Sequence, residues 1–181
     1  VSRRSEIELI RAAKERGYAV TCEATPHHLF LSSDDLPRLG NRGDMRPRLA
    51  APDDVAALWE NLAYIDIFAT DHAPHASHTK EAPLDQAPPG MLGLETALAL
   101  AITELDMPLA DIVAALSWHP AAIAGVADRH GRPIAVGEPA NLTVFHPTQQ
   151  WTVVPAQLAS KSRNTPYAGR TVQGKVRHTI F

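Results

Sequence analysis

Residues 64–75 read Tyr-Ile-Asp-Ile-Phe-Ala-Thr-Asp-His-Ala-Pro-His, and this stretch decides the fold. Its first seven residues are rich in β-branched and aromatic side chains, as is typical of a buried parallel strand. One acid and two imidazoles follow at the carboxyl end, where barrel enzymes carry their reactive groups. We therefore predict a functional turn at Asp71, His72 and His75. The alternative is that Asp71 only caps the turn and that both histidines are solvated loop residues.

The composition is that of an ordinary globular protein. The 181 residues are 45% hydrophobic and 20% charged, which is enough for a sizeable core. Seventeen basic and 20 acidic residues, without a basic stripe, argue against nucleic acid as a partner. The longest apolar stretch, 94–105, is too short for a membrane span, so we expect no membrane segment. The single cysteine, Cys22, excludes an internal disulfide and favours a reducing, cytoplasmic location.

Helical and strand-like segments alternate in the first part of the chain. Apolar residues at helical spacing predict a helix that ends at Gly17, and residues 18–23 have the composition of a strand. Asp53 and Asp54 then open a second helix, which leads into the strand at 64–70. A complete β/α barrel needs about 250 residues. This order therefore predicts either a smaller α/β fold or the later part of a barrel.

The pattern changes after the functional turn. Residues 76–90 form a long, proline-rich loop that suggests a lid or a substrate rim, and a helix follows over 94–105. Another helix begins near Pro108 and should be interrupted at His119-Pro120. Short β-like runs then occur at 142–145, 151–154 and 171–176. We accordingly divide the chain into residues 1–127 and a small β-rich part, 128–181.

Four positions near predicted strand ends are candidates for function. Glu23 is best interpreted as a supporting or packing carboxylate, and the pair His27-His28 as structural. Arg46 lies in a loop that could aim its guanidinium at an anion, although a solvated surface arginine fits equally well. Asp71 could bind a metal and exchange a proton with water, as metal-assisted hydrolysis requires. One carboxylate cannot hold a divalent metal, however, and no His-x-His pair accompanies it.

Several motifs resemble those of the dihydroorotases, a family of cyclic amidohydrolases. The most specific is Asp71-His-Ala-Pro-His75 followed by Pro88-Pro-Gly-Met-Leu-Gly-Leu-Glu-Thr96. The resemblance extends over nearly the whole chain. More specifically, the chain is similar to the dihydroorotase domain of the multifunctional pyrimidine-synthesis polypeptide of animals. The other matching stretches are Val20-Thr-Cys-Glu-Ala-Thr-Pro-His-His-Leu-Phe-Leu31, Arg46-Pro47, Asp54-Val-Ala-Ala-Leu-Trp-Glu-Asn-Leu62 and Asn164-Thr-Pro-Tyr-Ala-Gly169.

The resemblance implies the C-terminal part of a TIM-like (β/α)8 metal-dependent hydrolase barrel with a binuclear Zn2+ centre, followed by part of a small β-domain. It implies reversible hydrolysis of (S)-dihydroorotate to N-carbamoyl-L-aspartate in de novo pyrimidine biosynthesis. By position, Asp71 matches the family's metal-binding aspartate and general base. Arg46 and His75 match substrate-contacting side chains. Ala73, Pro89 and Gly90 match backbone contacts to the substrate.

The resemblance also sets expectations about completeness and partners. In the family the remaining metal ligands lie before the segment that matches Val1-Ser2, so we expect the 181-residue chain alone to be inactive. The alternatives are another cyclic amidohydrolase, of the allantoinase or hydantoinase type, and a non-catalytic relative that scaffolds an aspartate carbamoyltransferase. The residue at position 75 distinguishes an allantoinase-type enzyme from a dihydroorotase, and His75 favours the dihydroorotase. Retention of Asp71 argues against the non-catalytic relative. A homodimer and association with aspartate carbamoyltransferase are the expected assemblies.

Overall fold

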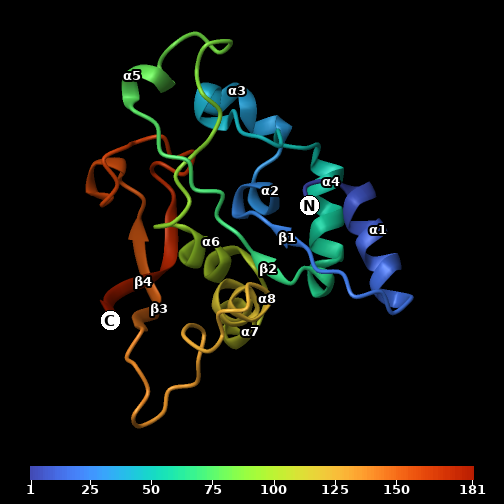
Figure 1. Ribbon diagram of the computed structural model, residues 1–181. Helices are drawn as coiled ribbons and strands as arrows, with labels where there is room; N and C mark the ends of the chain where they lie inside the picture. Colours follow the sequence, from blue (N-terminus) through green and yellow to red (C-terminus); the bar gives the residue numbers. More distant parts are fainter.

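Two short strands pair in parallel near the centre of the molecule, with helices around them (Figure 1). β1 (Glu23–Ala24) lies beside β2 (Ile67–Phe68), and a further parallel bridge joins His72 to Met91. Three chain segments therefore run side by side in one direction, each leading toward the same edge. This computed structural model, which describes residues 1–181, confirms the predicted α/β class.

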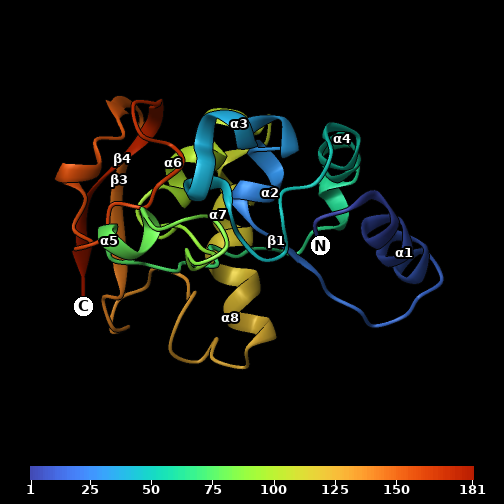
Figure 2. The same ribbon diagram turned by 90° about the horizontal axis from the view of Figure 1, so that it is seen from above.

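The helices surround these segments in two groups. α1 (Arg4–Glu15) packs against α4 (Pro52–Glu60), and α6 (Ala97–Glu104) lies between α2 (Pro26–Phe30) and the C-terminal strands. Seen from above, α1 and α4 lie at one end of the molecule and the C-terminal strands at the other (Figure 2). The remaining helices are α3 (Leu36–Leu39), α5 (Ser77–Lys80), α7 (Leu109–Val113) and α8 (His119–Ile123). None of the helices has the length and apolar character that a membrane crossing needs.

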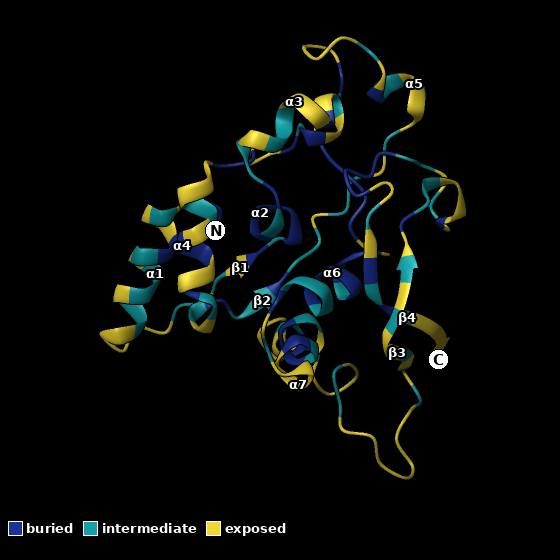
Figure 3. Ribbon diagram, turned by 180° about the vertical axis from the view of Figure 1, so that it is seen from behind, coloured by how far each residue is buried: buried dark blue, intermediate teal, exposed yellow.

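Two apolar clusters form the core, and the segments buried in them gather around α2 and α6 (Figure 3). The first cluster packs Ile7 and Leu58 of the outer helices against Phe68 of β2. The second joins Met91 and Leu100 to residues of the C-terminal part of the chain, namely Val153, Tyr167 and Val172. The C-terminal segment is thus part of the packing around the strand ends.

The C-terminal strands form an antiparallel pair. β3 (Leu142–Thr152) pairs with β4 (Thr171–Ile180), with register breaks after Val144 and after His146. The sequence predicted two separate runs, 142–145 and 151–154, where the structure has one irregular strand. Pro147, which lacks an N–H for the ladder, lies inside the second break. The division of the chain near residue 127 remains a prediction.

Three other expectations about element boundaries are wrong. Of the strand expected at 18–23 only Glu23 is in β1, and the strand expected at 64–70 reduces to Ile67–Phe68, because each strand has a single partner in a two-stranded sheet. The helix expected over 94–105 begins only at Ala97, and Leu94 is 64% exposed. His119-Pro120 does not interrupt the helix, because a π-helical turn over Ala114–Trp118 leads directly into α8. Pro120 lies in the first turn of α8, where a missing N–H is tolerated.

Candidate active site

Asp71 lies just beyond β2 in an unusual backbone conformation. Its φ is +47°, in the left-handed region that costs a side-chain-bearing residue about 1–2 kcal/mol and that aspartate tolerates better than most. Its carboxylate is exposed and lines an open cavity of about 590 Å³. Backbone outliers of this kind concentrate at functional sites, which directs attention to this cavity.

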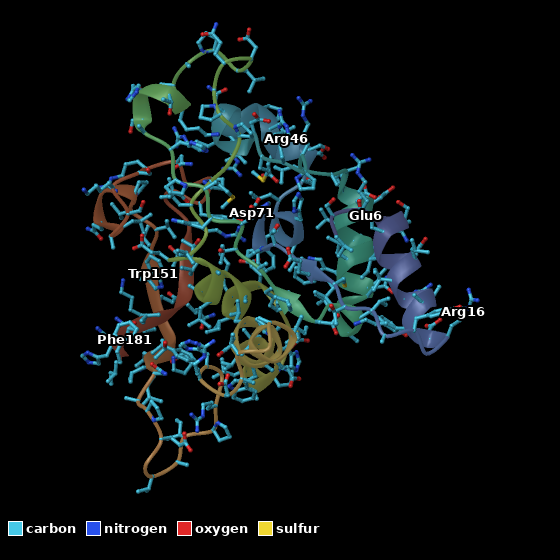
Figure 4. The ribbon with its side chains drawn as sticks, in the orientation of Figure 1. Glu6, Arg16, Arg46, Asp71, Trp151 and Phe181 are labelled. Atoms are coloured by element: carbon cyan, nitrogen blue, oxygen red, sulfur yellow. The ribbon has the colours of Figure 1, made fainter.

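Arg46 lines the same cavity as Asp71. Figure 4 labels Arg46 beside α3 and Asp71 nearer the centre of the molecule. Arg46 donates from Nη1 to the Asp44 carboxylate and to the Met45 carbonyl, 3.0 Å away. Its side chain is 51% exposed, so the guanidinium remains open to an anionic ligand. The full lining consists of Val1, Ser2, Glu6, Leu9, Ile10, Glu23, Thr25, His28, Arg46, Pro47 and Asp71.

Arg46 also borders a second cavity, of about 790 Å³, together with Arg48 and Pro89. This cavity lies between the α3 region and the loop that includes residues 84–89. The Gly90 N–H donates to the Asp44 carbonyl at 2.8 Å, which joins the loop to the Arg46 segment. The segment that carries the predicted contact Arg46 and the predicted contacts Pro89 and Gly90 are therefore neighbours in the fold.

Asn164 holds the remaining predicted contact residues together. Its buried side-chain amide donates to the carbonyls of Ala73 (2.9 Å) and Gly90 (3.2 Å), and its oxygen accepts from the His75 N–H at 3.2 Å. His75 in turn donates from Nε2 to the Pro89 carbonyl at 2.9 Å. All of the amide's hydrogen-bonding groups are used to set the relative positions of two loops.

Gly90 is required by the closeness of those loops. Its φ is +130°, and a Cβ at this position would lie 2.5 Å from the Ala73 Cβ and 3.0 Å from His75 Nε2. No side chain fits there without displacing one of the two residues. The glycine therefore allows 73–75 and 89–90 to meet.

His72, the other imidazole of the predicted turn, has a structural function. Its Nδ1 accepts from the N–H groups of Gly93 (3.0 Å) and Leu94 (3.3 Å). This arrangement places the ring proton on Nε2 and fixes the backbone just before α6. A reactive function for His72 is therefore less favoured than one for Asp71, which faces the cavity.

His27 and His28 differ in their surroundings. His27 is fully buried, neither ring nitrogen has a partner, and burial lowers its pKa to about 3. His28 lies on the cavity that contains Asp71, and its ring nitrogens contact the Thr25 hydroxyl (2.7 Å) and the Pro47 carbonyl (3.0 Å). Burial lowers the pKa of His28, while the Pro47 carbonyl and the Asp71 carboxylate act in the opposite direction. Both rings therefore favour the neutral form.

The donor groups of this chain do not make a metal centre by themselves. No three His, Cys, Asp or Glu side chains are placed to share an ion. His28 already uses both ring nitrogens, and among the predicted site residues Asp71 is the one with a ligand-type side chain that lines this cavity. A carboxylate in this position fits one corner of a metal site.

Sequence reasoning missed the function of Asn164. The stretch Asn164-Thr-Pro-Tyr-Ala-Gly169 stands out in the sequence, but the contacts of Asn164 lie 74 to 91 residues away. A local pattern does not reveal such partners. The only available signal is an asparagine before a rigid Thr-Pro pair, in a segment that is otherwise poor in helix or strand character.

Comparison with known proteins places this chain in a family. The model described as "Amidohydrolase family" matches residues 5–181. The chain is 44% identical to the "Dihydroorotase" of Mycobacterium leprae and 47% identical to that of Streptomyces coelicolor, covering 97% and 99% of this chain but only 42% and 43% of the relatives. It is 41% identical to the "Multifunctional protein CAD" of Squalus acanthias, over all of this chain and 8% of that protein.

Solved structures agree with this placement. An L-hydantoinase from Arthrobacter aurescens superposes with a TM-score of 0.89 and 29% identity over 99% of this chain and 42% of its own. An inactive dihydroorotase-like domain of a Chaetomium thermophilum CAD-like protein has the same fold, with a TM-score of 0.71 and 24% identity over all of this chain and 48% of its own. The chain thus spans about two fifths of the length of the curated dihydroorotases that it matches. It belongs to the amidohydrolase family.

Proposed function

We propose that the complete protein is a dihydroorotase, which hydrolyses (S)-dihydroorotate reversibly to N-carbamoyl-L-aspartate. The observation that carries the proposal is that the Asp71 carboxylate and the Arg46 guanidinium line one cavity at the end of a parallel strand. The first is a group that can move a proton, and the second can bind a carboxylate. The relatives named dihydroorotase support the same conclusion at 42–47% identity.

We also propose that the chain forms the later part of a TIM-like barrel and part of a small β-domain, with the division near residue 127. The parallel order β1, β2 and Met91 supports the first part, and the antiparallel pair of β3 and β4 supports the second. In such a barrel the cavity at Asp71 would open at the carboxyl ends of the strands, where barrel enzymes bind their substrates.

In this proposal the predicted contact residues hold an anionic ring. Arg46 would bind the substrate carboxylate, and in doing so its guanidinium would be shared between the substrate and Asp44. His75 and the backbone of Ala73, Pro89 and Gly90 would contact the ring amides, from positions that Asn164 and Gly90 fix in advance. Groups held this way need little reorganisation when the substrate binds.

Asp71 would act on the proton of the attacking water. Its carboxylate would accept that proton and donate it to the ring nitrogen that departs when the cyclic amide opens. A zinc centre, with Asp71 as one ligand, would supply an acidified water. The left-handed backbone at Asp71 keeps the carboxylate beyond the strand end and exposed to the cavity.

Two other functions compete with this one. The similarity to an L-hydantoinase favours a related ring-opening hydrolase, but its 29% identity is well below the 42–47% of the dihydroorotases. An inactive dihydroorotase-like domain shares the fold, with a TM-score of 0.71, and a non-catalytic role is the second alternative. The presence of Asp71 at the cavity argues against it. Association with aspartate carbamoyltransferase, like a homodimer, remains a prediction.

A parallel substrate assay tests the proposal. The complete protein is given dihydroorotate, hydantoin and allantoin, and the initial rates of ring opening are compared at equal substrate concentration. We expect clear preference for dihydroorotate. Preference for hydantoin or allantoin would move the protein to a related activity, and no turnover of any ring would favour the scaffold. The inactivity expected of the 181-residue chain alone is tested in the same assay.

A further inference from the structure

Lys80 has surroundings that are unusual for a lysine in a surface loop. It ends α5, yet it is only 6% exposed. Its ammonium donates to the carbonyls of Pro88 (2.9 Å) and Asp44 (3.4 Å) and forms no salt bridge. A charge buried without a counter-ion is costly, and lysines are among the residues least often buried. The position therefore calls for a functional reason.

The two carbonyls belong to segments that carry predicted substrate contacts. Pro88 directly precedes Pro89 and Gly90, and Asp44 lies two residues before Arg46. The Asp44 carbonyl also accepts from Gly90, and its carboxylate pairs with Arg46. Asp44 thus connects the lysine, the loop and the guanidinium.

A neutral side chain holds the α5 end of the loop, so the charge of Lys80 is not needed there. Asn41 already donates to the carbonyls of Lys80 (2.9 Å) and Ala82 (2.7 Å), which fixes the α5 end of the loop. The ammonium acts at the other end, next to the hydrogen bond between His75 and Pro89. Burial lowers the pKa of Lys80, and Asp44 opposes that shift while Arg46 adds to it. The two cations therefore repel each other, and the Asp44 carboxylate attracts both.

We propose that Lys80 is a positioning residue, whose ammonium fixes the Asp44 and Pro88 carbonyls and thereby places Arg46 opposite Gly90 for binding of the substrate carboxylate. The proposal rests on the proposed function for the identity of the anion. Lys80 itself lines neither of the two cavities that contain Arg46. Lys80 acts on Arg46 through Asp44, and its ammonium adds positive charge near the Arg46 guanidinium, which favours an anionic ligand.

The test uses the complete protein and four variants: Lys80→Met, Lys80→Arg, Arg46→Met and the double variant Lys80→Met/Arg46→Met. Exposed Lys161, whose side chain makes no hydrogen bond or salt bridge, provides the control Lys161→Met. We expect Lys80→Met to raise the KM for dihydroorotate about tenfold with kcat changed less than threefold, and Lys80→Arg to restore most of the KM. The control should match the wild type. Once Arg46 is absent, Lys80→Met should have little further effect on kcat/KM, because the two residues share Asp44 in one hydrogen-bond network and such residues couple.

Additive effects of the two substitutions, or a loss confined to kcat, would overturn the proposal. A second readout needs no turnover: amide hydrogen exchange of the segment around Gly90, whose N–H is bonded to Asp44. Faster exchange in Lys80→Met than in Lys161→Met supports the proposal, and equal exchange overturns it. If Lys80→Met does not fold, Lys80→Gln takes its place in both measurements. Failure of the wild type to open dihydroorotate would count against the proposed function, whereas the exchange result would still decide the part played by Lys80.

Discussion

Replacement of Gly90 by alanine tests whether the close approach of two loops forms the site. The added Cβ would lie 2.5 Å from the Ala73 Cβ and 3.0 Å from His75 Nε2 at a φ of +130°. The backbone conformation costs a residue with a side chain about 1–3 kcal/mol. Relief of the overlap costs roughly another 1–3 kcal/mol. We therefore expect a loss of about 2–6 kcal/mol in the free energy of unfolding.

Gly17 provides the matched control for this substitution. It also has a positive φ, +82°, but a Cβ there would have no neighbour within 4 Å. Gly17→Ala should therefore cost only the backbone contribution, about 1–2 kcal/mol. Urea unfolding of both variants of the complete protein, compared at equal slope, separates the overlap from the backbone strain.

Activity provides the second measurement. Displacement of Ala73 or His75 by about an ångström should lower kcat/KM on the order of 10²-fold in Gly90→Ala, while Gly17→Ala keeps the wild-type value. If Gly90→Ala unfolds no more easily than Gly17→Ala, the close contact is not a constraint of the fold. If it is destabilised but fully active, these loops do not form the site.

Three further outcomes are expected. Asp71→Asn should lower kcat for dihydroorotate ~10²- to 10⁴-fold in initial-rate assays. His28→Ala should retain much of the activity, because the His28 ring nitrogens are hydrogen-bonded to Thr25 and Pro47. Equal rates for Asp71→Asn and wild type would show that the aspartate takes no part in the reaction. Burial lowers the pKa of His27 to about 3, whereas an unfolded histidine titrates near 6.5, so the unfolded state takes up the proton first as pH falls. The His27 contribution to stability is full above pH 6.5 and should drop by about 2 kcal/mol between pH 7 and pH 5. In urea titrations His27→Leu should remove this contribution, while the smaller one of His28 stays. Asn164→Asp places a carboxylate against two carbonyls, so it should lower the free energy of unfolding by roughly 2–5 kcal/mol and remove most of the activity. The exposed control Asn141→Asp should do neither in the same unfolding and rate measurements.

The sequence predicted those parts of the site that depend on local pattern. A short apolar strand followed by Asp71 is recognisable because burial and chain direction place the next residue at the strand end. The helices that became α1 and α4 were predicted from their apolar spacing for the same reason. Arg46 was left ambiguous, since its exposure and its pairing with Asp44 depend on how the loop folds.

The parts that were missed depend on contacts between distant segments. Lys80 looks like a solvated residue in a polar loop, and only the folded chain brings its ammonium to carbonyls 8 and 36 residues away. The short helix α2 was also missed, because five residues are too few for a periodic pattern. The one local signal for this helix was Thr25 followed by Pro26, a pair typical of a helix start. In the structure the Thr25 hydroxyl accepts a hydrogen bond from the His28 N–H.

The contacts of Asn164 bear on how the chain is divided. Residues 1–127 contain Asp71, Arg46 and the other predicted contacts, yet the amide that fixes Ala73, His75 and Gly90 comes from beyond the proposed boundary. The same C-terminal segment buries Val153 and Tyr167 in the core cluster that includes Met91, the residue after Gly90. A boundary near residue 127 therefore marks a change in topology, from parallel to antiparallel pairing, while the site requires both sides. For that reason, substitutions in the C-terminal segment should alter turnover without touching the substrate, and Asn164 is the residue through which they would act.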